Sequence, residues 1–328
     1  MLRATALAAV LATLLLPAAA RTEPLDLDLV RLGSPSPEVW GVVSEYGGVP
    51  LDAATQLRLA NESKQRFARL STELGLAMSS ALLQPGSTTG HSGFDVDLEG
   101  AYAQIHPAAV GAGTAEYPAS GPWPTRGSTP HELFLPSVHV RKALPFSFEL
   151  GGRLVYLSQS TYWGSQIEGK WALNEGFWWL PDLAVRAALT KLWGHKDLDL
   201  DVTDLDFIAS RKFAVGGVVG LTPYLAARFA WLRANSDLLD FAPNRAVDPD
   251  YPGADPRATK TAFGKLRATH YRTTFGVRMT ASAVSIAAEV THFGGADEDG
   301  EASPAADEYP DYEVDSSVTG ALKLGLEF

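Results

Sequence analysis

The chain has 328 residues, no cysteine and a formal net charge of −11. The lack of cysteine excludes a disulfide scaffold and a lipid-modified N-terminal cysteine, and the negative charge argues against nucleic acid as a partner. The average hydrophobicity fits a soluble protein, but a barrel wall that alternates apolar and polar residues gives the same average. The class of protein therefore has to be decided from the pattern along the chain.

The first twenty residues are predicted to be a signal peptide. Arg3 supplies a positive charge, residues 6–16 are apolar except for Thr13, and Ala18 and Ala20 fit a small-residue cleavage site. We expect cleavage after Ala20. An uncleaved anchor helix is the weaker alternative, because the apolar run is shorter than the ~20 residues that cross a bilayer. No later run is long enough for a transmembrane helix.

Residues 21–92 form a separate N-terminal segment, in which a helix is predicted over about 53–78. Its apolar residues recur at spacings of three, four or seven, which is helical periodicity. Such a helix needs a surface to pack against. Two placements stay open: a periplasmic appendage, or a plug inside a barrel. The plug candidates are Leu57, Phe67, Leu70, Leu74 and Leu76.

From residue 93 to residue 328 the period drops to two, as in β-strands. Segments of roughly ten residues, the length of a tilted membrane strand, recur at 94–102, 131–143, 146–156, 166–173, 182–190, 198–212, 224–232, 267–279, 284–291 and 322–328. In 198–212 the phase of the alternation slips between Val202 and Leu205, which we interpret as a β-bulge. The predicted fold is all-β: one antiparallel transmembrane barrel of about ten strands, within a range of 10–14.

The polar face of these segments is charged, and it is predicted to face the lumen. A ten-stranded barrel is too narrow for a wide aqueous pore. A salt-bridged core that fills the interior is therefore favoured over a charged path for a solute. The lumen-lining candidates are Glu149, Arg153, Glu168, Lys170, Asp182, Arg186, Arg228, His270, Arg272, Arg278, Glu289 and Lys323.

Connection lengths and aromatic residues favour a membrane barrel over a soluble β-sandwich. Short turns are expected near 144–145, 174–177, 216–220 and 281–282, and longer loops at 107–130, 235–262 and 294–313. Membrane barrels have such a short-turn side and a long-loop side. Aromatic residues gather near strand ends, as in interfacial girdles: Trp163, Trp178, Trp179, Trp193, Phe293 and Phe328.

The last strand resembles the assembly signal of Gram-negative outer-membrane proteins, in which a terminal Phe follows apolar residues at alternate positions. Here those residues are Leu322, Leu324, Leu326 and Phe328. The resemblance implies outer-membrane location, contact with membrane lipid and lipopolysaccharide, and recognition by the barrel-assembly machinery. The layout, with sequence before the barrel, is similar to the fatty-acid-transporter (FadL-like) group. That group usually has more strands than are counted here.

Two functions remain open. The first is a channel or passive transporter for a small solute, with hydrophobic solutes among the candidates. The second is a structural or adhesive barrel with a closed lumen and working extracellular loops. Catalysis is not expected, because His139, His270 and His292 lie in no motif with a nucleophile. The acidic loop at 294–315 matches no calcium-loop spacing, and we expect no metal and no cofactor.

Overall fold

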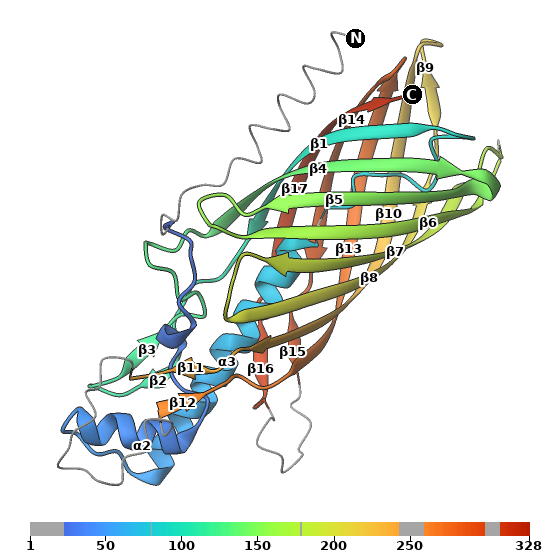
Figure 1. The fold of residues 1–328 in the computed structure, drawn as a ribbon. Helices are drawn as coiled ribbons and strands as arrows, with labels where there is room; N and C mark the ends of the chain where they lie inside the picture. The colour runs from blue at the N-terminus through green and yellow to red at the C-terminus, as the bar shows by residue number, and fades with distance from the viewer. Residues whose placement is uncertain (1–22, 80, 178, 243–258, 299–308) are drawn as a thin grey trace.

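The computed structural model describes residues 23–79, 81–177, 179–242, 259–298 and 309–328. Ten antiparallel strands pair side by side, and the first pairs with the last, so the sheet closes into a barrel (Figure 1). The predicted fold class is confirmed. The strands are β1 (Phe94–Gln104), β4 (Glu132–Leu144), β5 (Phe148–Tyr156), β6 (Trp163–Asn174), β7 (Asp182–Trp193), β8 (Leu198–Ser210), β10 (Val219–Ser236), β13 (Leu266–Ala281), β14 (Val284–Phe293) and β17 (Ser317–Glu327).

The remaining elements are short, apart from two helices near the N-terminus. The helices are α2 (Pro37–Tyr46) and α3 (Ala53–Met78), with the 3-10 turns η1 (Leu29–Leu32) and η2 (Pro145–Ser147). The helices begin with caps: Ser36 Oγ accepts from Val39 N, and Asp52 Oδ1 accepts from Thr55 N. The minor strands are β2 (Val110–Gly113), β3 (Pro118–Ser120), β9 (Phe213–Val215), β11 (Leu239–Asp240), β12 (Lys260–Thr261), β15 (Ala296–Glu298) and β16 (Tyr312–Val314).

The wall alternates between an exposed apolar face and a buried inner face. On β17 the side chains of Leu322, Leu324 and Leu326 are exposed, whereas Lys323 is buried. Exposed aromatic residues lie near both ends of the strands: Tyr156, Trp163 and Trp193 at one end, and Phe148, Trp171, Phe177, Trp179 and Phe328 at the other. The prediction that Phe293 belongs to an interfacial girdle is wrong, because Phe293 is buried and shares the inner face of β14 with Glu289. Trp178 lies outside the described residues.

The predicted bulge in β8 is wrong. Its register against β7 and β10 is continuous, and alternate residues from Leu198 to Ser210 all point inward. The inner face of this strand is apolar at Leu200 and Val202 and charged at Asp204 and Asp206. This change of composition along a single face looks like a slip of phase when only the sequence is read.

The two ends of the barrel differ in their connections. The turn end carries the connections 145–147, 175–181, 211–218 and 282–283, and Phe94 pairs there with Phe328 through two backbone hydrogen bonds of 2.9 and 2.8 Å. The loop end carries the long connections 105–131, 237–265 and 294–316, together with two shorter ones. The predicted asymmetry of short turns and long loops is therefore present.

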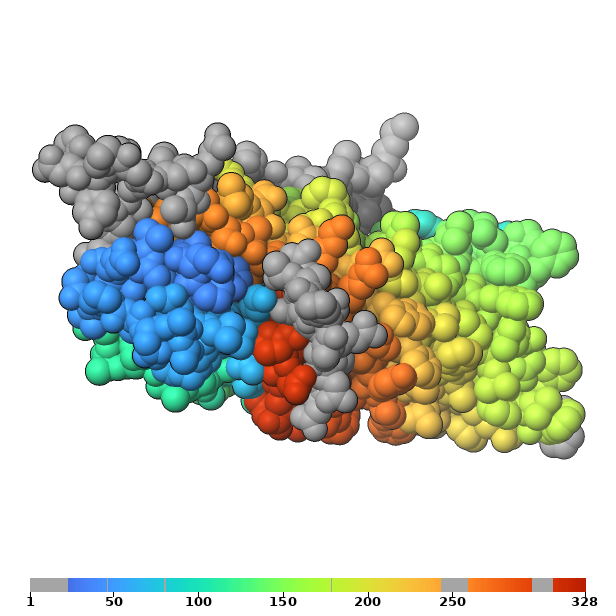
Figure 2. Space-filling view, turned by 90° about the horizontal axis from the view of Figure 1, so that it is seen from below, coloured from blue at the N-terminus to red at the C-terminus, as the bar shows by residue number. Residues whose placement is uncertain are grey.

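The N-terminal segment lies at the loop end and then runs into the barrel. Helix α2 and the first half of α3 lie outside the strands, while the second half of α3 enters the lumen (Figure 1). Seen from below, the described residues near the N-terminus, coloured blue, form one end of the molecule, and the barrel strands extend away from them (Figure 2). The predicted signal peptide and its cleavage site lie outside the described residues. Among the described residues, no helix is long and apolar enough to cross a membrane.

Candidate functional site

The loop-end half of the lumen is filled by the second half of α3. Phe67, Leu70 and Leu74 are fully buried, and Phe67 stacks on Phe263 with a ring-centre distance of 4.4 Å. The barrel wall around this part of the helix is apolar. Its buried inner residues include Ala101, Leu133, Leu135, Val155, Leu192, Leu198, Leu200, Val202 and Leu232.

Two of the plug candidates need separate comment. Leu57 is 53% exposed, so it does not line the lumen; it lies in the part of α3 that projects beyond the barrel. In the same part of α3 the buried residue is Leu59, which is 2% exposed and packs with Trp40 of α2. Leu76 is buried, like Phe67, Leu70 and Leu74. The periodicity identifies the apolar stripe, but only the fold shows where that stripe leaves the lumen.

After α3 the chain continues through the lumen without regular secondary structure. Its backbone groups bond to charged side chains of the wall. The Glu289 carboxylate accepts from Leu82 N at 2.7 Å and from Leu83 N at 2.6 Å. Arg153 Nη1 donates to Ala81 O at 2.7 Å. These bonds satisfy backbone groups that no helix or sheet satisfies here, and leaving such groups unpaired is costly.

The same pattern extends to the turn end of the barrel. Lys170 Nζ donates to Ser87 O at 3.0 Å, and the Glu149 carboxylate accepts from Thr89 N at 3.0 Å. Gly93 O then accepts a bond from Ala143 N, and β1 begins at the next residue. The segment 67–93 thus runs along the barrel from the loop end to the turn end.

The wall charges also pair with one another in a chain across neighbouring strands. His139 lies between Glu99 and Glu168, with nitrogen–oxygen distances of 3.0 and 3.1 Å. Arg186 connects Glu168 to Asp206. This series of ion pairs ends with Asp206 and Arg228, and a separate pair joins Asp204 to Arg272. Pairing of this kind is what buried charges require.

A second cluster joins the first and last strands. Asp95 and Asp97 of β1 contact Arg141 of β4 and Lys323 of β17, with the Lys323 distances at 3.2 and 2.9 Å. Asp97, together with Glu99 and His139, has ligand atoms close enough to hold a metal ion. The two cations on Asp97 already compensate its charge, so we assign no metal to this group.

The structure places all twelve lumen-lining candidates in buried positions, none more than 8% exposed. Several inner residues were not among those candidates: Asp95, Asp97, Glu99, His139, Arg141, Asp204 and Asp206. The alternation already places the first five on the polar face. Asp204 and Asp206 were missed because the supposed bulge left the facing of β8 undecided.

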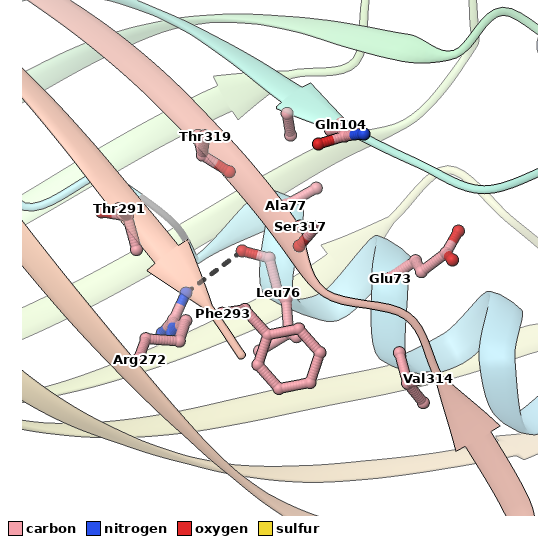
Figure 3. A pocket seen from close by; sticks show the side chains of 11 residues that line it. Glu73, Leu76, Ala77, Gln104, Arg272, Thr291, Phe293, Val314, Ser317 and Thr319 are labelled. Carbon is pink, nitrogen blue, oxygen red and sulfur yellow. Dashed lines mark hydrogen bonds between the residues drawn. The ribbon is translucent and has the colours of Figure 1, made fainter. Parts of the chain in front are cut away.

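A small cavity remains between α3 and the wall at the loop end (Figure 3). Its volume is about 10 Å³, and its lining includes Glu73, Leu76, Arg272 and Phe293. Arg272 Nη1 donates to Leu76 O at 3.2 Å across it. A space of this size holds about one water molecule, so this cavity is not a path for a larger solute.

A larger pocket lies outside the lumen, at the loop end. It has a volume of about 320 Å³, at the lower end of the range for small-molecule sites. Trp40 and Tyr117 meet edge to face in its wall, 5.2 Å apart. Arg66 is buried there, and burial lowers the pKa of its guanidinium. Its donors bond to Leu32 O and Val110 O.

Comparisons with known proteins give no family. No family model matches the chain, and no curated protein matches it. Among solved structures, the translocator domain of autotransporter NalP from Neisseria meningitidis is 11% identical and has a TM-score of 0.35; the match covers 82% of this chain and 98% of that one. The KdgM porin in complex with disordered oligogalacturonate is 10% identical, with a TM-score of 0.30 and coverage of 71% and 99%. Neisserial surface protein A is 13% identical, with a TM-score of 0.27 and coverage of 72% and 97%. At these TM-scores, the fold assignment depends on the chain's own strand pairing.

Proposed function

We propose that the protein is an outer-membrane barrel whose lumen is closed by its own N-terminal segment, and that it works through its loop end. A bilayer location is supported by the exposed apolar face. Ile167, Leu189 and Phe275 are each more than half exposed and lie away from the ends of their strands. Aromatic residues border this face at both ends, as membrane interfaces require. A soluble barrel would leave this large apolar surface in water.

The observation that carries the closed state is the course of residues 67–93. The apolar second half of α3 fills one half of the lumen. A segment without regular secondary structure, whose backbone groups bond to wall side chains, fills the other half. Opening it would expose the paired wall charges and the backbone groups they hold. This supports the structural or binding role over the channel, and the role proposed is non-enzymatic.

The loop end offers the groups for such a role. It carries the pocket of about 320 Å³, with Trp40, Tyr117 and Phe241 in its lining. Convergent aromatic and charged groups in a pocket of this size favour recognition of a small molecule or of a side chain. Membrane lipid, lipopolysaccharide and the barrel-assembly machinery are the partners that the barrel itself implies.

Planar-bilayer recording tests the closed state. We expect negligible single-channel conductance from the full chain, because residues 67–93 occupy the lumen. The same measurement on a variant lacking residues 21–83 tells what closes it. If the variant conducts, the N-terminal segment closes the lumen. If the variant also shows negligible conductance, the side chains of the wall close it. Steady conductance steps from the full chain would contradict the proposal.

A second candidate is transport through a displaced plug, the role that the FadL-like layout suggests. One observation favours it: the segment after α3 is held by side chains, such as Glu289 and Arg153, rather than by a continuous backbone ladder. Water can replace such bonds when a segment moves. Solute uptake into vesicles by the full chain, lost when residues 67–93 are held in place by a cross-link, would support transport.

A further inference from the structure

We infer that the barrel displays its own N-terminal segment: residues 23–66, here named the cap, lie on the outer side of the membrane, and the lumen is the route by which the chain reaches them. This rests on the bilayer location in the proposed function, but not on the closed lumen. The inference goes against the periplasmic alternative for this segment, because the cap and the start of β1 lie at opposite ends of the barrel.

The closed wall leaves the chain only an axial path. Every one of the ten strands pairs on both sides, and the closing pair β1–β17 runs in register from Asp95–Glu327 to Ala103–Thr319. Among the residues that the structure describes, the ring of paired strands is closed around the segment. The chain therefore enters the lumen after the cap at one end and leaves it before Phe94 at the other.

The connections decide which end faces outward. Membrane barrels have short periplasmic turns and longer extracellular loops. In this chain the three long connections, 105–131, 237–265 and 294–316, are all at the loop end. At the end where β1 begins, each of the four connections has eight residues or fewer; two short connections, 157–162 and 194–197, also lie at the loop end, but no long one lies at the turn end. By this rule the cap lies on the extracellular side and the start of β1 lies on the periplasmic side.

The cap is bound by the outer loops themselves. Leu27 N donates to Tyr162 Oη at 2.6 Å, and Asp28 N donates to Pro124 O at 2.9 Å. Farther along, Arg58 Nη2 donates to Gly113 O at 2.9 Å. The contacts come from two connections, 105–131 and 157–162, so the cap and these loops form one surface. A cap at the turn end of the barrel would lose all of these bonds.

The lumen is wide enough to serve as the route. It holds α3, and an α-helix with side chains is about 10–12 Å across, whereas an extended chain is narrower. The fit to the helix is close, because a Cβ on Gly75 would lie 2.4 Å from Leu232 Cδ1. A passage that admits a helix also admits the extended residues of the cap before they fold outside.

Cysteine labelling tests the inference, since the chain has no cysteine of its own. The variant Leu57→Cys places one thiol on the cap, at a side chain that is 53% exposed. Its matched control, Val218→Cys, places one in a turn at the opposite end, where the side chain is 78% exposed. With a membrane-impermeant maleimide on intact cells, we expect labelling at Leu57→Cys. Val218→Cys should react only after the outer membrane is permeabilised.

The reverse pattern would overturn the inference, and so would equal labelling of both variants, or of neither, in intact cells. Val49→Cys and Val215→Cys form a second pair, at side chains 44% and 53% exposed, in case one of the first variants does not fold. Heat-modifiable gel mobility separates the two proposals. If the gel mobility of the chain does not change on heating, the chain is no membrane barrel and the proposed function fails. A heat-modifiable barrel labelled only from the turn end keeps that function and loses the displayed cap.

Discussion

Both halves of the lumen are filled by the N-terminal segment, but the walls that face it differ: one is apolar and the other is charged. Toward the loop end the wall is apolar, with Leu200, Val202 and Leu232 against α3. Toward the turn end the wall is charged, with Glu289 and Arg153 against a segment without regular structure. Both halves are buried, so exposure to water does not explain the difference.

The difference follows from what each part of the plug can do for itself. A helix pairs its own backbone groups, so its partner surface needs only apolar contact. Residues 81–92 lie in no helix or strand, so their buried N–H and C=O groups lack a regular ladder of backbone partners and must find others. Leu83 even adopts a left-handed φ of 50° there, a conformation held while both it and Leu82 donate to Glu289. The wall composition is thus matched to the conformation of the plug.

Removing a central charge of the turn-end half should have the largest effect. Arg186 is fully buried between Glu168 and Asp206. Arg186→Met leaves these carboxylates without their shared cation, and breaking a buried pair costs about 3–5 kcal/mol. Urea unfolding in lipid vesicles measures it. Leu189→Met, a lipid-facing change on the same strand, is the control. A loss below that of the control would mean that the charged half does not hold the barrel together.

Crowding the apolar half should have a smaller effect. Gly75→Ala adds a methyl 2.4 Å from Leu232 Cδ1 and 3.1 Å from Val202 Cγ2. Overpacking of this kind costs about 1–3 kcal/mol. The same urea titration measures it. Gly320→Ala on β17 is the matched control, because no heavy atom lies within 4 Å of the added Cβ. Equal stability of the two variants would show that α3 is loosely seated.

Glu73 lies where the helical half meets the loops, and it gives a pH-dependent effect. Its carboxylate accepts from Trp123 Nε1, and burial raises the pKa of this carboxyl above its usual value of 4.5. A raised pKa stabilises the fold below pH 4.5, and that contribution is lost as the pH rises through the raised pKa. Wild type should therefore lose stability relative to Glu73→Gln between acidic and neutral pH. A constant difference across this range would contradict the assignment.

The smallest effect is expected outside the lumen. Lys191 bridges Asp199 and Asp201 at 2.9 and 3.2 Å, with all three side chains at least 39% exposed. Lys191→Gln should change the free energy of unfolding by no more than about 1 kcal/mol, because water and salt screen such pairs. Urea unfolding at low and high salt checks this. A loss as large as that of Arg186→Met would remove the contrast between buried and exposed charges.

Several features could be predicted from the sequence alone. The period of two placed Leu322 outside and Lys323 inside, and the period of helical residues located α3. These predictions succeed because each is a local consequence of backbone geometry: alternate strand residues face opposite sides, and residues three or four apart share a helix face. The short turns followed from the same local signals, whereas β10 and β17 begin five residues before the predicted segments 224–232 and 322–328.

Only the tertiary structure decided how the lumen is filled and where the N-terminal segment lies. The inner face of β8 is apolar at Val202 and charged at Asp204. Such a strand has no local signature, because each half of its inner face matches a different part of a plug that lies more than a hundred residues away in the sequence. Leu57 shows the same limit: its periodicity is that of Phe67, yet it lies beyond the rim. Periodicity states which way a side chain points, and the partner that covers it is set by contacts between distant parts of the chain.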